Sequence, residues 1–303
     1  MNNYIEYKRK VKVIDNTKPK LDVHIKDKYF MNQYFNKYDF TAIDNVDGDI
    51  KDNVETFGDV DTSKPGTYTI KYRVKDGSGN ESEVEKKVIV DNKVGLICLT
   101  FDDGPSSNIT PKVLDVLKEK DIKATFFLLN YNDDKIDIVK REINEGHSLG
   151  LHGYSHTYSE IYQSVDTARE NIIKIQDRVR NTTGVNSKLI RFPGGSSNTI
   201  SEKFDKGLMT RLIQEMSQEG FNYFDWNVSG EDAGSSKTSE DVYNNVMKGI
   251  KSGRTNVVLL HDFSSNKKML EILPRIIDDA KNLGYDFEPI TNQTDTIIHN
   301  VKN

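Results

Sequence analysis

Two adjacent carboxylates, Asp102 and Asp103, stand directly after an apolar run in the sequence. The run, residues 94–101, consists mostly of Val, Leu, Ile, Cys and Phe, which is typical of a strand buried on both faces. Side-by-side carboxylates repel each other unless a cation or a shared proton relieves them, and a metal ion at this strand end would give the two side chains different roles. An ordinary turn is the alternative interpretation, because the D-G-P sequence is also good turn chemistry.

Two histidines in the motif H-G-Y-S-H offer a second kind of ligand. His152 and His156 have three residues between them, a spacing that lets both imidazoles reach one ion from a turn or a helix. The spacing alone is often coincidence, but with an aspartate from a neighbouring strand end it makes a set that suits zinc or another divalent metal. His147 is expected to be structural, and His24 and His299 are expected on the surface.

Strands that alternate with helices must position these residues. The apolar spacing predicts seven strands, at residues 94–101, 123–129, 148–152, 188–192, 222–226, 256–261 and 285–290. The longest of the intervening helices is expected at residues 165–183, and Pro274 is expected at the edge of an element. Such alternation implies a mostly parallel sheet, and seven repeats indicate a barrel of irregular closure. The carboxyl ends of parallel strands share one rim, where seven residues are expected to converge: Asp102, Asp103, His152, Arg191, Asp225, Trp226 and His261.

The first ninety or so residues show strand periodicity instead. Apolar and polar residues alternate on both sides of the turn D-G-S-G-N, which predicts a hairpin with one face in a core. With the segment A-I-D-N-V-D-G-D-I, residues 16–91 resemble the immunoglobulin-like modules of bacterial surface proteins. K-V-K-V at residues 10–13 echoes K-V-I-V at residues 87–90, so residues 1–15 are predicted to be the last strand of a preceding module, or a linker.

Three aspartates, Asp44, Asp47 and Asp49, fall in one turn of this module. Their spacing lacks the D-x-D-x-D-G pattern and the terminal Glu of an EF-hand loop, so an Asx-rich turn is preferred to a calcium site. The module has no row of aromatic residues that the sequence would place on its surface. A spacer is therefore the expected role, with binding to a polymer as the alternative.

Composition and charge limit the class of protein. A length of 303 residues leaves room for two domains, and a net charge of -5 gives no reason to expect nucleic acid or an anionic membrane as partner. No run approaches the length of a membrane span, and the first residues lack the apolar core of a signal peptide. The protein is therefore either cytosolic or exported by a signal further upstream. Cys98, the only cysteine, is expected to pack inside a strand.

Five motifs in order carry a resemblance to one family. They are T-F-D-D-G-P (100–105), H-G-Y-S-H (152–156), R-F-P-G-G (191–195), D-W (225–226) and L-L-H (259–261). Together they resemble the polysaccharide deacetylases, the NodB-homology domain of carbohydrate esterase family four. The resemblance assigns residues 92–291 to this domain and leaves 292–303 as a C-terminal tail. It implies an α/β fold, an irregular (β/α)7-type barrel, preceded by the smaller all-β immunoglobulin-like sandwich.

The resemblance implies a metal-dependent hydrolase that removes acetyl groups from N-acetylglucosamine polymers. Asp103, His152 and His156 would hold the ion, with zinc expected and cobalt, manganese or nickel as alternatives. Asp102 would act as general base, because the ion lowers the pKa of a water molecule and a carboxylate can finish the deprotonation. Arg191 would pair with Asp102 and orient it.

The same resemblance assigns an acid and a substrate pocket. His261 would protonate the leaving amine, and a carboxylate near it, Asp225, would raise its pKa. Four further residues would supply an oxyanion N–H and line the acetyl pocket: Gly194, Pro193, Trp226 and Leu259.

Three positions depart from the family pattern. Gly153 replaces the usual Ser or Thr, which removes a hydroxyl that steadies the loop, although Ser155 could compensate. Gly194 replaces the usual aromatic residue, which alters the groove wall and keeps the backbone N–H. The fourth motif is shortened to F-D-W, and the downstream acids Glu231 and Asp232 could replace or supplement its aspartate.

Two other functions remain open. One is a surface carbohydrate-binding protein whose barrel has lost catalysis, against which the retained Asp102 and His261 argue. The other is a metal amidase of similar fold that acts on a small nitrogenous metabolite, against which the surface-type module argues. Within the favoured class, peptidoglycan is the leading substrate, and chitooligosaccharide, poly-N-acetylglucosamine and acetylated xylan are alternatives. A monomer at the cell surface or in the cell wall is expected.

Overall fold

The computed structural model describes residue 9 and residues 14–303, in two compact units that divide after Asn92. Each unit has a hydrophobic core of its own. The strand predicted within residues 1–15 lies, apart from residues 9, 14 and 15, outside the described residues. In the part of the chain that is described, no helix is both long enough and apolar enough to cross a membrane.

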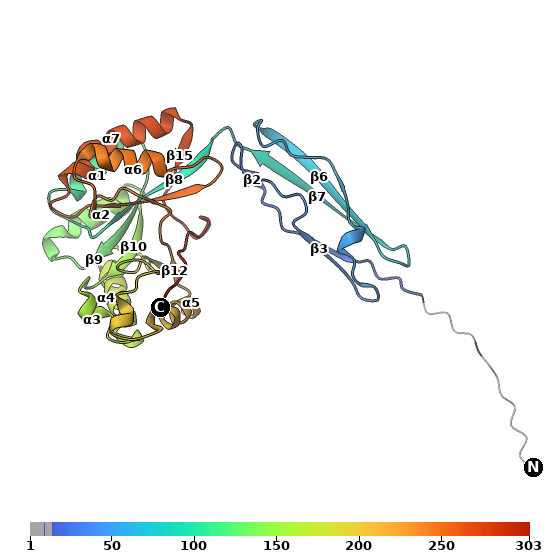
Figure 1. Cartoon of the computed structure of the whole chain (residues 1–303), viewed down its shortest axis with the longest axis horizontal. Helices are drawn as coiled ribbons and strands as arrows, with labels where there is room; N and C mark the ends of the chain where they lie inside the picture. The colour runs from blue at the N-terminus through green and yellow to red at the C-terminus, as the bar shows by residue number, and fades with distance from the viewer. Residues whose placement is uncertain (1–8, 10–13) are drawn as a thin grey trace, which may run out of the picture. The chain divides into compact units, whose positions relative to one another are not determined.

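The N-terminal unit is a sandwich of two small sheets (Figure 1). One sheet is antiparallel, with β1 (Lys20–Val23), β3 (Phe40–Asp44) and β4 (Gly48–Asp49). The other runs β2 (Lys28–Tyr29), β7 (Glu81–Val90), β6 (Gly66–Lys75) and β5 (Glu55–Phe57), and only its β2–β7 pair is parallel. The 3-10 turn η1 (Lys51–Asn53) precedes β5. The predicted hairpin is confirmed as β6 and β7, because the alternating residues Ile70, Tyr72, Val74 and Val88 are buried between the sheets.

The second unit is a curled, parallel sheet covered by helices (Figure 1). Its strands are β8 (Gly95–Asp102), β9 (Thr125–Leu129), β10 (Ser148–Gly153), β11 (Leu189–Ile190), β12 (Asn222–Tyr223), β13 (Val228–Ser229), β14 (Thr255–His261) and β15 (Tyr285–Phe287). The order across the sheet is β12-β11-β10-β9-β8-β14-β13, and β15 also pairs with β8. This half-barrel confirms the predicted (β/α)7-type fold.

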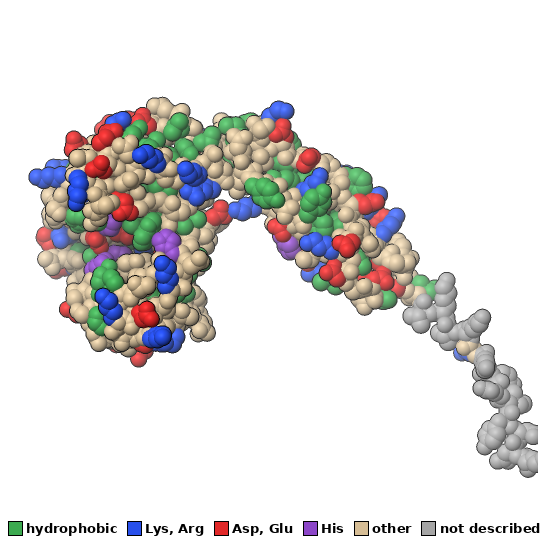
Figure 2. Space-filling model, in the orientation of Figure 1, with side chains coloured by type: hydrophobic (Ala, Val, Ile, Leu, Met, Phe, Trp, Pro, Cys, Tyr) green, Lys and Arg blue, Asp and Glu red, His purple; other side chains and the backbone are tan. Residues whose placement is uncertain are grey.

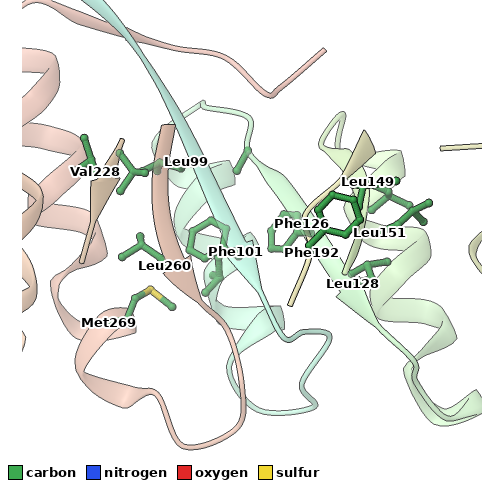
Figure 3. Packing of buried hydrophobic residues seen from close by; sticks show 14 of the residues in the cluster. Leu99, Phe101, Phe126, Leu128, Leu149, Leu151, Phe192, Val228, Leu260 and Met269 are labelled. Carbon is green, nitrogen blue, oxygen red and sulfur yellow. The ribbon is translucent and has the colours of Figure 1, made fainter. Parts of the chain in front are cut away.

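β8 is the centre of this sheet, and all eight of its residues are buried. β14 pairs with it along its whole length, whereas its other edge is shared, with β15 beside residues 95–97 and β9 beside residues 100–102. Figure 3 shows side chains of β8 packed among those of neighbouring strands, such as Phe126 and Leu260. Cys98 is fully buried there, as predicted. The register places Asp102 opposite His261, so two expected site residues share one strand end.

Seven helices surround the described sheet: α1 (Thr110–Glu119), α2 (Ile136–Asn144), α3 (Tyr158–Ile161), α4 (Val165–Thr183), α5 (Leu208–Gln218), α6 (Ser239–Gly249) and α7 (Lys267–Asn282), with short 3-10 turns η2 (Asp133–Lys135) and η3 (Ser201–Lys203). α4 has the predicted bounds, because Ser164 and Thr167 form a capping box and Gly184 ends the helix at φ 77°. Pro274 lies inside α7, so its predicted place at an edge is wrong. The buried face of α7, with Leu273 and Ile277, keeps the helix intact across the missing N–H.

The sheet closes through an irregular segment. β11 and β12 have two residues each where strands of five were predicted, and β13 was not predicted. β12 and β13 are the two edge strands of the sheet, although they are consecutive in the chain. Residues 224–227 therefore connect the two edges across the gap in the half-barrel. The carbonyls of Phe224 and Asp225 accept hydrogen bonds from the Arg191 side chain. A side chain therefore takes the place of a neighbouring strand, which explains why the predicted strand stops early.

Residues 292–303, predicted as a tail, pack on the second unit. The carbonyl of Ile297 accepts the Asp225 N–H at 2.8 Å, and the His299 N–H donates to the Asp225 carboxylate at 2.7 Å. His299 Nε2 also donates to the Trp226 carbonyl at 2.7 Å. The predicted surface position of His299 is therefore wrong. Its partners include main-chain groups that no sequence pattern marks.

Candidate active site

A pocket of about 230 Å³ lies at the carboxyl ends of the strands in the second unit. Eight predicted site residues line it: Asp102, Asp103, His152, His156, Gly194, Trp226, Leu259 and His261. Three more, Arg191, Pro193 and Asp225, are buried and do not line it. Figure 2 shows histidine side chains together on one face of this unit. Four other residues line the pocket and were given no role from the sequence: Tyr158 and Ala233, and Phe192 and Gly195 of the R-F-P-G-G motif.

Asp103, His152 and His156 form a compact group of potential ligands, each with one ligand atom within 4.8 Å of the others. His152 Nε2 lies 3.5 Å from Asp103 Oδ1, and His156 Nε2 lies 3.9 Å from the same oxygen. Asp103 Oδ1 is buried, and within the described chain it has no hydrogen-bond partner. A buried carboxylate oxygen without a partner is rare unless an ion completes it. The residues therefore fit a divalent metal.

The protonation of the two imidazoles suits this role. His152 Nδ1 donates to the Arg191 carbonyl at 2.7 Å, because a carbonyl can only accept, and this leaves the Nε2 lone pair free. Burial lowers the pKa of His156, and its neighbour His152 lowers it further. The lowered pKa favours the neutral form of His156, which is the form that binds metals.

Backbone geometry explains how two adjacent aspartates can face different partners. Asp102 still belongs to β8, whereas Asp103 has a left-handed backbone at φ 71°, which Asp tolerates better than most residues. Gly104 follows because no side chain fits there: a Cβ at this position would lie 2.4 Å from both carboxylate oxygens of Asp262. The D-D-G sequence is therefore required by the shape of the strand end.

Asp102 is fixed by a buried cation. Arg191 is fully buried, and its Nη1 donates to Asp102 Oδ1 at 2.9 Å and to Thr100 Oγ1 at 2.6 Å. The same side chain also donates to the carbonyls of Phe224 and Asp225. Asp102 Oδ2 is 3.9 Å from His152 Nε2, beside the metal ligands. This pairing holds the Asp102 carboxylate in one orientation, as a general base requires.

Asp232, and not Asp225, is the carboxylate that holds His261. Asp232 Oδ1 is 3.0 Å from His261 Nδ1, and its Oδ2 accepts the His261 N–H at 2.8 Å. Asn266 Nδ2 fixes Asp232 Oδ2 at 2.6 Å. Burial lowers the pKa of His261, but the hydrogen bond and charge of Asp232, with Asp102 and Asp103, outweigh it and raise the pKa to about 9.

The predicted place of Asp225 beside His261 is therefore wrong. Asp225 Oδ1 accepts the Ser196 N–H at 2.8 Å, and its Oδ2 accepts the Ser196 hydroxyl and the His299 N–H. Asp225 thus fastens the loop after β11 to the C-terminal segment. Asp232 comes from the irregular segment between β13 and α6, where no periodic pattern points to a partner.

The loop that carries the two histidines is held by a residue that the sequence did not mark. Asn171 of α4 accepts the Ser155 N–H at 2.7 Å and donates to the Ser155 carbonyl at 3.0 Å. Gly153 is required here, because it has φ 140° and a Cβ would lie 2.4 Å from Asn171 Nδ2. The amide of Asn171 therefore steadies the loop in place of the missing hydroxyl.

Tyr158 of α3 lies beside Gly194, the second position that departs from the family pattern. A Cβ at Gly194 would lie 3.1 Å from the hydroxyl of Tyr158, and Gly194 has φ 77°. Tyr158 lines the pocket and its ring lies 5.2 Å from that of His156. In the described residues, no hydrogen bond uses the Gly194 N–H, which leaves it available to a ligand. A Cβ at Gly195 would lie 3.0 Å from the Trp226 ring, so this wall is made of closely fitted main chain and rings.

Family models match both units. Residues 90–213 match the model described as polysaccharide deacetylase, and residues 29–90 match the model described as bacterial surface protein, Ig-like domain. Among curated proteins, YheN of Bacillus subtilis, which is assigned to the polysaccharide deacetylases, is 35% identical over 197 residues. That match covers 63% of this chain and 65% of YheN, less than two thirds of the relative's length.

Solved structures resemble the second unit closely. The catalytic domain of a peptidoglycan N-acetylglucosamine deacetylase from Eubacterium rectale is 37% identical, with a TM-score of 0.65 and coverage of 69% of this chain and 94% of that chain. A family 4 acetyl xylan esterase from Clostridium thermocellum, in complex with a cobalt ion, is 27% identical. Its TM-score is 0.54, with coverage of 64% of this chain and 87% of that chain.

Proposed function

Because this chain belongs to the polysaccharide deacetylase family, we propose that it is a metal-dependent hydrolase that removes the N-acetyl groups of peptidoglycan N-acetylglucosamine. The relative from Eubacterium rectale supports this substrate. The N-terminal unit is an Ig-like domain of the bacterial surface type, which supports a place of action at the cell surface or in the cell wall. We further propose that the protein is a monomer and that its substrate is a polysaccharide chain.

One observation carries the proposal: a buried base and a protonated acid flank the same group of ligands. Asp102 is paired with Arg191, and His261 is paired with Asp232. Both Asp102 and His261 line the pocket that contains Asp103 and the two ligand histidines. A site that only binds a sugar needs neither a base nor an acid, so this arrangement favours hydrolysis.

The ion would be held by Asp103, His152 and His156. When bound, a divalent metal supplies Lewis acidity, which polarises the acetyl carbonyl and makes a nearby water molecule more acidic. Zinc is the metal we propose, because two imidazoles and a carboxylate with open positions suit it. Cobalt, manganese and nickel are the competitors for the same ligands.

The residues of the chain divide the proton transfers between them. Asp102, oriented by Arg191, takes the proton of the attacking water. The N–H of Gly194 donates to the carbonyl oxygen as negative charge develops on it. His261 is protonated below pH 9 and gives its Nε2 proton to the leaving amine, while Asp232 holds its Nδ1. Trp226 and Leu259 enclose the acetyl group.

Acetate release tests the proposal. The chelated protein would be assayed on peptidoglycan and on chitooligosaccharides, and assayed again after addition of zinc, cobalt or manganese. We expect release that depends on the added metal and is greater from peptidoglycan. Acetate release from chitooligosaccharide alone would contradict the assignment of peptidoglycan as the substrate. Metal binding without any acetate release would favour a carbohydrate-binding protein.

A further inference from the structure

A second group of carboxylates lies at one end of the N-terminal unit. Asp15, Asp44 and Asp76 each offer one oxygen, and these oxygens lie within 4.8 Å of one another. They come from three separate segments: the chain before β1, the end of β3 and the turn between β6 and β7. Within the described part of the chain, no Lys or Arg forms an ion pair with any of them. Three negative charges thus converge without a visible counter-charge.

Two of these carboxylate oxygens, one from Asp44 and one from Asp15, are buried and accept no hydrogen bond. Asp44 is only 4% exposed, and its Oδ1 accepts the N–H groups of Val46 and Asp47 at 2.8 and 3.0 Å. Asp44 Oδ2 has no hydrogen-bond partner. Asp15 repeats this pattern, because its Oδ1 accepts the Thr17 N–H and its Oδ2 is buried without a partner. The oxygen that each residue leaves for the group is therefore Oδ2, and an ionised oxygen buried in this way needs a partner.

Hydrogen bonds fix the third carboxylate and join the segments. Asp76 Oδ1 accepts the N–H groups of Ser78 and Asn80 at 2.9 and 2.7 Å. Asn80 Nδ2 donates to Asp76 Oδ2 at 2.7 Å and to the Asp15 carbonyl at 3.2 Å. The three segments are thus placed together before any ligand arrives.

We propose that Asp15, Asp44 and Asp76 bind a calcium ion. The donors are all oxygen atoms, which hard cations prefer, and zinc would favour a group that includes nitrogen or sulfur. Calcium takes oxygen ligands at about 2.3–2.6 Å, so two ligands on opposite sides of it lie up to about 5 Å apart. The three oxygens lie within 4.8 Å of one another, which is inside this limit. Bound calcium would cross-link both sheets to the segment that enters β1.

Calcium titration of the full chain tests this site, and the proposal does not rest on the catalytic function. Chelator-treated protein would be titrated with calcium chloride by calorimetry, and its thermal unfolding followed with and without calcium. We expect a dissociation constant on the order of 0.1–1 mM, as in extracellular modules, and a higher unfolding temperature for the N-terminal unit. Asp44→Asn should weaken calcium binding by more than about tenfold, because it removes a direct ligand charge.

Asp49→Asn is the matched control, because Asp49 lies in β4, directly after the turn that follows Asp44, and its carboxylate accepts only the exposed Lys51 N–H. It should leave calcium affinity unchanged. Asp15→Asn, outside any strand, serves as a second variant in case Asp44→Asn fails to fold. Acetate release should be unchanged in all three. The proposal is overturned if wild-type protein shows no calcium response, if Asp49→Asn loses as much affinity as Asp44→Asn, or if magnesium binds more tightly than calcium.

Discussion

Burial and charge act in opposite directions on the imidazole of His261. Burial lowers its pKa, and the carboxylate of Asp232, with Asp102 and Asp103, raises it to about 9, above the usual value of 6.5. A pKa that is higher in the folded state stabilises the protein fully below pH 6.5, and this contribution is lost as the pH rises through 9. The same shift keeps the proposed acid protonated at neutral pH. The pH dependence of activity can therefore distinguish the roles of Asp225, in the fourth motif, and Asp232, downstream of it.

Asp232→Asn should lower the alkaline limit of activity. The substitution removes the charge that raises the pKa of His261 and leaves the burial that lowers it, so the falling limb of the kcat/KM profile should move down by about 1–2 pH units. Acetate release measured across pH 5–10 would show this. Asp225→Asn is the control: it should lower the unfolding temperature and leave the limb in place. Equal movement in both variants would contradict the assignment of Asp232.

Asp102→Asn should separate catalysis from metal binding. The amide cannot accept a proton, so kcat should fall by about 10²–10⁴-fold, while Asp103 and the two histidines still bind zinc. Acetate release and metal content of the purified variant are the two measurements. His152→Ala should lose both properties, and full activity in that variant would show that the ligand assignment is wrong.

At the scale of elements, α4 supports the loop that carries the proposed metal ligand His156. Asn171 holds both the N–H and the carbonyl of Ser155, the residue directly before His156. Removal of such a support lets the ligand loop take other conformations. The loop therefore depends on a helix that begins nine residues after His156 and does not itself line the pocket.

Asn171→Ala should weaken zinc affinity by about 10- to 100-fold, the usual effect of removing a residue that orients ligands. Competition with a chelator of known affinity would measure it, and restored activity at high zinc would show that the reacting groups are intact. Gln176→Ala is a matched control, because Gln176 lies on the same helix and binds the Ser187 carbonyl. A similar loss of affinity in both variants would indicate general destabilisation of α4.

The C-terminal segment should also matter to the site. A chain that ends at residue 291 leaves the Asp225 N–H and the Trp226 carbonyl without their partners, Ile297 and His299. We expect a lower unfolding temperature of the second unit and a KM that rises more than kcat falls, because Trp226 lines the pocket. Ile298→Ala, which changes an exposed side chain between those partners, should behave as wild type. Unchanged stability and KM in the shortened chain would refute this role.

Sequence patterns predicted the interactions that are local and missed those that depend on tertiary contacts. The buried run of β8, the capped α4 and the grouping of His152 with His156 could be predicted from periodicity and motif spacing. The choice of Asp103 as the third proposed ligand came from the family resemblance. Asp232 was named only as one of two alternatives to Asp225, and Asn171 was not predicted, since their partners are brought together only by folding. The early end of β12 has the same cause, because a buried arginine takes the carbonyls of the next segment.

At the scale of the whole molecule, the proposed catalytic groups all lie in the second unit. A chain that begins at Lys93 should therefore keep its kcat/KM on soluble chitooligosaccharide, while release from insoluble peptidoglycan should fall if the N-terminal unit acts as a spacer. Parallel assays of both chains on both substrates would measure this. Loss of activity on the soluble substrate, with the unfolding temperature unchanged, would show that the N-terminal unit contributes to catalysis itself.

One part of the site is made of main chain: the carbonyl of Arg191 orients His152, and Gly194 has only its backbone to offer the pocket. Every amino acid carries that carbonyl, so no substitution at position 191 removes it. Over evolutionary time a single mutation can erase the base or the acid, whereas the support of the first ligand histidine persists. A protein that loses hydrolysis in this way would still hold a cation beside a sugar. A single mutation could therefore convert the proposed enzyme into a lectin-like protein.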